Sequence, residues 1–228
     1  MSIKNGLTRE ELINIQDTIR KNNLHKNELN FKIVVIGDFG VGKTSIIGRY
    51  TEDEFSTEYK ITIGADFAIK RLEWDENTRI NLHVWDIAGH ERFGSLLSVF
   101  YRHAVAAAIV FDLTRPETFK SIDKWLSDLR RKIYLPGGKS IPVVILANKG
   151  DITTKTIPDH IKEYCEANGI LYWYITSAKQ NINIDEAMLK LTKAALTNYY
   201  GTQCSLITED IVTLKDEPKD NTPRSSCC

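Results

Sequence analysis

The sequence has few cysteines, and their positions exclude two kinds of stabilising site. The four cysteines lie at positions 165, 204, 227 and 228, so no pair has the spacing of a structural zinc site. Two of them are the last residues of the chain, which does not suit a disulfide scaffold. We therefore expect a chain without disulfides in a reducing compartment, the cytosol.

An excess of either charge and a long hydrophobic run are also missing. The sequence has 30 Lys and Arg residues against 30 Asp and Glu residues, so we expect no nucleic-acid-binding surface. It has no run of about 20 apolar residues and no apolar core of a secretory signal, which predicts neither a membrane-spanning helix nor export. With 228 residues and 42% hydrophobic content, one globular domain with polar tails is expected.

Apolar, β-branched stretches alternate with amphipathic stretches along most of the chain. Strands are expected at 31–36, 65–74, 78–86, 104–112, 142–147 and 171–175. Helices are expected up to about 51, at 116–134, at 158–168 and from 183 onward. This order predicts an α/β protein with the P-loop NTPase fold: a six-stranded, mostly parallel sheet with one antiparallel edge strand and helices on both faces.

Polar segments flank the expected domain, which covers 30–200. In the N-terminal extension, 1–29, Thr8 and Glu11 have capping-box spacing, and an apolar stripe predicts a short amphipathic helix near 9–21. Packing on the domain, binding a partner and fraying remain open as its role. The C-terminal segment, 201–228, has little to bury and is expected to be a flexible tail that ends in a double cysteine.

One stretch organises the chain. Residues 37–44 read Gly-Asp-Phe-Gly-Val-Gly-Lys-Thr after the first expected strand, which fits the phosphate-binding pattern G-x-x-x-x-G-K-[ST]. Glycines let the backbone curl so that successive N–H groups point at phosphate oxygens, and the following helix N-terminus adds positive potential. Lys43 can supply a charge to the β- and γ-phosphates, and Thr44 a hydroxyl to Mg²⁺.

Two further polar positions belong with a bound triphosphate. Asp86 ends an expected strand, and ligands of parallel sheets lie beyond the carboxyl ends of the strands, which places it beside the Mg²⁺. Gly89 can offer a backbone N–H to the γ-phosphate. Thr62 lies in a polar linker, where its hydroxyl could reach the metal only when the γ-phosphate is present, so this linker is predicted to be an order–disorder switch.

A third group selects the base. Asp151 follows Asn148 and Lys149 after a buried strand, and its carboxylate can accept hydrogen bonds from both N1–H and the exocyclic amine of guanine. Adenine lacks this pair of donors, which favours GTP over ATP and disfavours the alternative of a P-loop ATPase. Backbone N–H groups of 176–179, after the last expected strand, suit the guanine O6.

In this order and spacing, the stretches resemble those of the small Ras-like GTPases over about 30–200. Further stretches are similar to the Rab branch: 63–67, 84–86, 91–93, 100–102 and 111–114. Others look most like the subgroup of Rab thirty-two and Rab thirty-eight: 66–70, the isoleucine at 87, 135–137 and 181–186.

The resemblance implies a role for each matching position. The phosphates would be held by Asp38, Phe39, Gly40, Val41, Gly42, Lys43, Thr44 and Ser45. Phe55 would stack edge-on against a guanine that is held by Asn148, Lys149, Asp151, Ser177, Ala178 and Lys179. Mg²⁺ would be ligated by Thr44 and Thr62, and by Asp86 through water. Catalysis would fall to His90, Lys43 and Gly89, effector binding to Phe67, Trp85 and Phe100, and prenylation to Cys227 and Cys228.

The resemblance also implies a GTP/GDP switch in vesicle trafficking. Its partners would be an exchange factor, a GTPase-activating protein, an escort protein, a GDP-dissociation inhibitor and effectors. Prenyl groups would place it on the cytoplasmic face of endosomal, lysosome-related or phagosomal membranes, from which it would cycle with the cytosol.

Two residues depart from the family pattern. His90 stands where most of the family has the glutamine that orients the attacking water, and Phe39 stands where a small residue is usual. A bulky ring at Phe39 could crowd both the water and an incoming arginine finger, which is worth ~10³–10⁵ in rate. We therefore expect slow hydrolysis, and the alternative is a GTP-locked module that binds effectors with negligible turnover.

Overall fold

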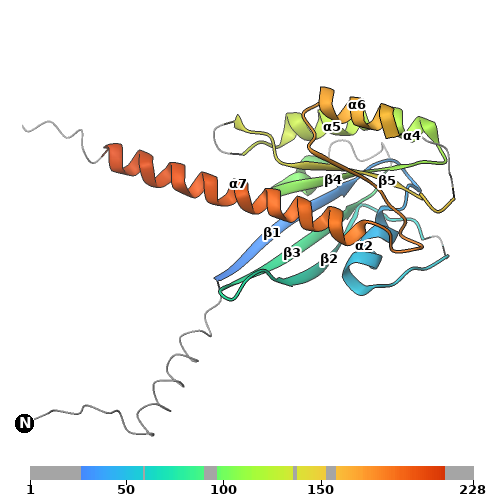
Figure 1. Cartoon of the computed structure of the whole chain (residues 1–228), viewed down its shortest axis with the longest axis horizontal. Helices are drawn as coiled ribbons and strands as arrows, with labels where there is room; N and C mark the ends of the chain where they lie inside the picture. The colour runs from blue at the N-terminus through green and yellow to red at the C-terminus, as the bar shows by residue number, and fades with distance from the viewer. Residues whose placement is uncertain (1–26, 59, 90–96, 136–137, 153–157, 214–228) are drawn as a thin grey trace, which may run out of the picture.

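The computed structural model describes residues 27–58, 60–89, 97–135, 138–152 and 158–213. They form a six-stranded sheet with strand order β2-β3-β1-β4-β5-β6 and helices on both faces (Figure 1). All neighbouring strands are parallel except β2 and β3, which are antiparallel at the edge. The expected fold is confirmed. Within the described ranges, no helix is both long enough and apolar enough to cross a bilayer.

The strands are β1 (Asn27–Ile36), β2 (Ala65–Glu73), β3 (Thr78–Ile87), β4 (Ala104–Asp112), β5 (Val143–Asn148) and β6 (Tyr172–Ile175). The helices are α2 (Lys43–Glu52), α3 (Leu97–Tyr101), α4 (Pro116–Lys120), α5 (Ile122–Lys132), α6 (Pro158–Ala167) and α7 (Ile184–Thr213). Strand β1 starts at Asn27, so the sheet takes in the last three residues of the expected N-terminal extension. The amphipathic helix expected at 9–21 lies outside the described residues.

The central strands are buried on both faces because helices cover each side. In β1, Ile33 and Val35 join a cluster with side chains of α2 and α7, while Val34 and Ile36 join a second cluster with side chains of α3, α5 and α6. This burial explains why β4, β5 and the last four residues of β1, from Ile33 to Ile36, are almost continuously apolar instead of alternating. The carboxyl ends of these three strands meet at one edge of the sheet.

Two helix predictions need correction. The single helix expected at 116–134 is two helices separated by a turn at Ser121. The backbone N–H of Ser121 still donates to the carbonyl of Glu117 (3.2 Å), as in a continuous helix, so the interruption is confined to one residue. The flexible tail expected from 201 is helical as far as Thr213, because α7 continues beyond the sheet (Figure 1). Its sequence has no proline before Pro218, so nothing forces the helix to stop where its apolar stripe ends.

Candidate functional site

A tight loop, 37–42, joins β1 to α2 and needs glycine at two positions. Gly37 has φ 140°, and a Cβ there would lie 2.1 Å from the carbonyl oxygen of Val110 in β4. Gly42 has φ 98°, and a Cβ there would lie 2.4 Å from Nδ2 of Asn148. The loop therefore packs closely against the ends of β4 and β5, which no larger residue would allow.

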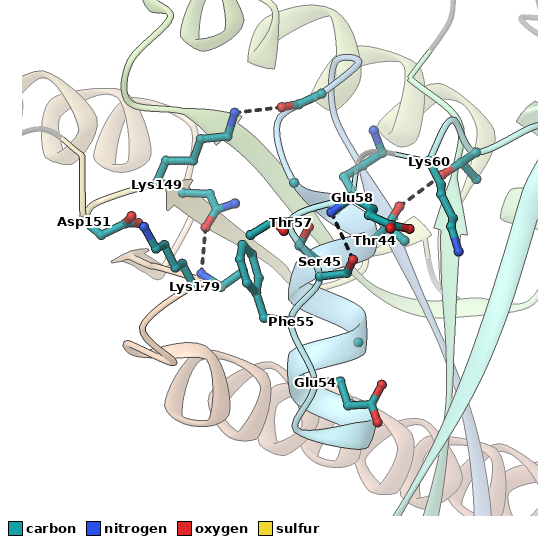
Figure 2. Close-up of a pocket in the computed structure, with 18 of the residues that line it drawn as sticks. Thr44, Ser45, Glu54, Phe55, Thr57, Glu58, Lys60, Lys149, Asp151 and Lys179 are labelled. Carbon is teal, nitrogen blue, oxygen red and sulfur yellow. Dashed lines mark hydrogen bonds between the residues drawn. The ribbon is translucent and has the colours of Figure 1, made fainter.

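The loop borders a cavity of about 640 Å³. Figure 2 shows Lys149, Asp151 and Lys179 toward one end of it and Thr44 toward the other, with Phe55 between them. The predicted residues that line it are Phe39, Gly40, Gly42, Lys43, Thr44, Ser45, Phe55, Thr62, Gly89, Asn148, Lys149, Asp151, Ala178 and Lys179. The tertiary structure thus gathers the predicted phosphate and base residues around one space.

Lys43 lies at the bottom of the loop, and its side chain is only 6% exposed. Its ammonium group donates to the carbonyls of Gly37 (3.0 Å) and Asp38 (2.9 Å). Burial lowers the pKa of Lys43 to about 8, although the charges of Asp86 and Asp38 oppose this effect. The nearby negative charges do not fully offset the cost of burying this ammonium group. It is therefore well suited to bind an anionic group such as a phosphate.

Three oxygen-bearing side chains meet beside Lys43. Thr44 Oγ1 donates to Asp86 Oδ2, Thr62 Oγ1 lies 3.1 Å from the same oxygen, and the two hydroxyl oxygens are 3.0 Å apart. Asp86 is 3% exposed, and its other carboxylate oxygen, Oδ1, has no hydrogen-bond partner among the described residues. Hydroxyls with one carboxylate fit Mg²⁺, which keeps several waters and is usually held by one or two carboxylates together with substrate phosphates.

At the other end of the cavity, the side chain of Asp151 is held by a hydrogen bond from a buried serine. Ser177 Oγ donates to Asp151 Oδ1 (2.6 Å) and accepts from the N–H of Gln180 (3.0 Å). The backbone N–H of Ala178 lies 3.4 Å from Asn148 Oδ1, which joins the loop after β6 to the end of β5. A carboxylate with a fixed orientation at the edge of the cavity can select a ligand with two adjacent N–H donors.

Four of the residues predicted to bind the nucleotide or the metal do not line the cavity. Val41 is fully buried in the core, and Asp86 lies behind the two threonines. Ser177 is fully buried and acts through Asp151. The side chain of Asp38 accepts a hydrogen bond from the indole N–H of Trp125 in α5 (2.8 Å), so this residue can face a ligand only through its backbone.

Of the three predicted effector residues, Phe67 and Trp85 form a stacked pair with ring centroids 5.5 Å apart, and Phe67 is 56% exposed. Phe100 and Trp85 are both partly buried against the core cluster under α3, α5 and α6. His90, Cys227 and Cys228 lie outside the described residues.

Sequence reasoning missed Asp112, at the end of β4, which is 1% exposed. It accepts from Lys149 Nζ (2.6 Å) and from Arg115 Nε (3.0 Å). Burial alone would raise the pKa of Asp112, but hydrogen bonds from Lys149, Thr114 and Arg115 bring it below its usual value. Its place at the carboxyl end of a central parallel strand could have identified it.

Comparisons with known proteins fit this site. The family model described as "Ras family" matches residues 32–197. The chain is 46% identical to mouse (Mus musculus) "Ras-related protein Rab-32" over 200 residues, which cover 87% of this chain and 90% of the relative. It is 44% identical to "Ras-related protein Rab-32B" of Dictyostelium discoideum (87% and 77% covered) and 42% identical to human (Homo sapiens) "Ras-related protein Rab-7L1" (87% and 97% covered).

Proposed function

The chain belongs to the Ras family, in its Rab branch, and it matches a subgroup like Rab-32. We therefore propose that the 640 Å³ cavity is its GTP and GDP site. The observation that carries this proposal is the pairing of Asp151 with Ser177 across the cavity from the loop at 37–42. An oriented carboxylate at one end suits guanine, and a buried lysine at the other suits phosphates.

The chain is a GTPase that acts in membrane trafficking, as Rab proteins do. Hydrolysis by in-line attack of water depends mainly on positioning and charge neutralisation. We assign the charge on the β- and γ-phosphates to Lys43, and a γ-phosphate hydrogen bond to the N–H of Gly89. Close approach of Gly89 to the loop supports this, since a Cβ there would lie 2.5 Å from the nitrogen of Phe39.

Family membership implies nucleotide binding that typically uses Mg²⁺, and the residues beside Lys43 fit this ion. We assign Thr44 and Thr62 as direct ligands and Asp86 as a ligand through water. When bound, the ion would neutralise developing charge on the phosphates. Thr62 lies in the segment between α2 and β2, and its hydroxyl is already beside Asp86. When Mg²⁺ and the γ-phosphate are bound, ligation of the ion by Thr62 would order this segment.

Thermal unfolding with GDP and with ADP tests the site. We expect GDP with Mg²⁺ to raise the melting temperature of nucleotide-free protein clearly, since a ligand at a thousandfold excess over Kd adds about 4.1 kcal/mol. ADP should leave it unchanged, because it lacks the donors that Asp151 requires. Equal shifts for both nucleotides, or none for GDP, would contradict the assignment of the base site.

We further propose that hydrolysis is slow because of His90 and Phe39. An imidazole can position water, but with a different reach from glutamine and with a titrating proton. Phe39 supports the proposal, because it lines the cavity and is 38% exposed. The alternative function, a GTP-locked module that only recruits effectors, differs in having no measurable turnover even when cell extract supplies an activating protein.

The His90→Gln variant should hydrolyse GTP faster than the natural protein. We expect roughly a tenfold gain, because a glutamine would orient the attacking water, and a misplacement of about 1 Å can cost ~10² in rate. Single-turnover hydrolysis with preloaded GTP measures this directly, and His160→Gln, a change of an exposed histidine in α6, is the matched control. An unchanged rate in His90→Gln would remove His90 as the cause.

For its location we propose endosomal, lysosome-related or phagosomal membranes, on their cytoplasmic face, with geranylgeranyl groups on Cys227 and Cys228. Two chains are needed because one gives only marginal binding to a bilayer. An escort protein and a GDP-dissociation inhibitor would handle the lipidated form, and effectors would contact Phe67, Trp85 and Phe100. The stacking of the exposed Phe67 ring on the partly buried Trp85 ring supports this last role.

Replacing both cysteines by serine should move the protein from membranes to the cytosol. We expect an almost complete shift, because a chain without prenyl groups has no other lipid anchor in this proposal. Fractionation of cells that express tagged protein measures it, and Cys165→Ser, a change of a buried cysteine in α6, is the control. Retention of the double variant on membranes would show that something other than prenyl groups holds it there.

A further inference from the structure

Three consecutive carbonyls of the loop at 37–42 each accept a hydrogen bond from a different side chain. Asn148 Nδ2 donates to the carbonyl of Val41 (2.9 Å), and Lys149 Nζ to that of Gly40 (2.9 Å). The third, that of Phe39, accepts from Nη2 of Arg115 (2.8 Å). Asn148 and Lys149 belong to the base-binding motif, whereas Arg115 belongs to none of the recognised motifs and lies between β4 and α4.

Arg115 also contacts the residue that holds Lys149. Its Nε donates to Asp112 Oδ2 (3.0 Å), the same oxygen that accepts from Lys149 Nζ (2.6 Å). The other oxygen of Asp112, Oδ1, accepts from the hydroxyl (2.6 Å) and the N–H (2.9 Å) of Thr114. Both oxygens of the carboxylate are therefore held by hydrogen bonds. Because Arg115 and Lys149 share one of these oxygens, loss of the Arg115 side chain should shift the position of Lys149.

We propose that Arg115 is a positioning residue for nucleotide retention. It holds the Phe39 carbonyl and the Asp112 carboxylate at the same time, and so keeps the phosphate loop and Lys149 in the arrangement that receives the nucleotide. Arg115 does not line the cavity, so it acts through these neighbours. This inference rests on the proposed nucleotide site, in which Lys149 contacts the base and the loop at 37–42 contacts the phosphates.

Only arginine can make this bridge. Its planar guanidinium presents Nε–H and Nη2–H in a rigid fork, and here the two groups bond to acceptors on different segments of the chain. A lysine at 115 would keep the charge but offers one flexible ammonium group, which cannot reproduce both directions. The Arg115 side chain is 36% exposed, so water can replace it at the Phe39 carbonyl with little cost to folding.

The test compares Arg115→Lys and Arg115→Met with Arg131→Met. Arg131 is a suitable control because its side chain is 76% exposed and pairs only weakly with Asp128 (3.2 Å), away from the cavity. The release rate of a fluorescent GDP analogue and the melting temperature of nucleotide-free protein are measured for each. We expect both Arg115 variants to release GDP roughly tenfold faster, since hydrogen bonds to charged groups are among the stronger ones. The melting temperature of Arg115→Lys, which keeps a cation beside the buried Asp112, should match that of the control.

A double variant adds a readout that a purely structural role would not affect. Since Arg115 and Lys149 share Asp112 Oδ2, the effects of Arg115→Met and Lys149→Met on GDP release should be less than multiplicative when combined. Three results would each overturn the proposal. The first is multiplicative effects in the double variant, and the second is GDP release at the natural rate from Arg115→Lys. The third is faster release that occurs only together with a lower melting temperature of the nucleotide-free protein. If the natural protein retains no GDP, the proposed function itself fails, which the unmodified protein reveals before any variant is made.

Discussion

Changing Asp151 to asparagine should cost the protein nearly all of its affinity for GDP. The carboxylate would accept two N–H groups of guanine, whereas an amide places its own NH₂ donor opposite one of them. A site built around such hydrogen bonds rejects a mismatched partner by up to ~10⁴-fold, so a loss of roughly 10³–10⁴-fold is expected. Ser177 can still bond the Oδ1 position, so the loop itself should keep its shape.

The same variant should gain affinity for a different base. Xanthine has a carbonyl where guanine has its exocyclic amine, so the asparagine NH₂ can donate to it while the side-chain oxygen accepts from N1–H. Titration of Asp151→Asn with GDP and with xanthosine diphosphate measures both effects. Asp159→Asn, at an exposed carboxylate in the first turn of α6, should behave as the natural protein. Unchanged GDP binding by Asp151→Asn would place guanine recognition elsewhere.

Replacing Lys43 by methionine should abolish useful nucleotide binding while leaving the fold intact. Removing one partner of a buried charge pair costs about 3–5 kcal/mol, which corresponds to roughly 10²–10⁴-fold in affinity. Hydrolysis should fall further, because loss of one donor to the transition state is typically worth ~10²–10³ in kcat. Calorimetric titration with GDP and single-turnover hydrolysis measure the two effects, with Lys190→Met on the exposed side of α7 as the control.

Lys43→Met should also change how stability depends on pH. In nucleotide-free protein, burial lowers the pKa of Lys43 from 10.5 to about 8, so between these values the unfolded chain binds more protons than the folded chain. Stability of the natural protein should therefore rise with pH across this window, by at most roughly 3 kcal/mol from this group. The variant lacks this contribution, so urea unfolding at pH 7.5 and 9.5 should show a larger gain for the natural protein. An equal gain in both proteins would mean that burial does not lower the pKa of Lys43.

Most of the secondary structure could be predicted because it depends on local pattern. The expected strand at 104–112 coincides with β4, and the hairpin strands differ from prediction by one residue at one end each. The predictions differ from the structure at two places: α7 continues to Thr213, and a turn at Ser121 separates α4 from α5 within the helix expected at 116–134. Neither local propensity nor periodicity measures these effects.

The sequence by itself determined the chemistry at both ends of the cavity. Three short motifs carry this chemistry, and each requires its residue types for a physical reason that is visible in the sequence. They are the glycines before Lys43, the aspartate at the end of β3 and the stretch from Asn148 to Asp151. Only the tertiary structure decided which side chains hold these motifs in place. Arg115 reaches Phe39, and Trp125 reaches Asp38, across 76 and 87 residues of sequence. Such partners follow from the placement of β4 beside β1, a long-range pairing that no local pattern of residues encodes.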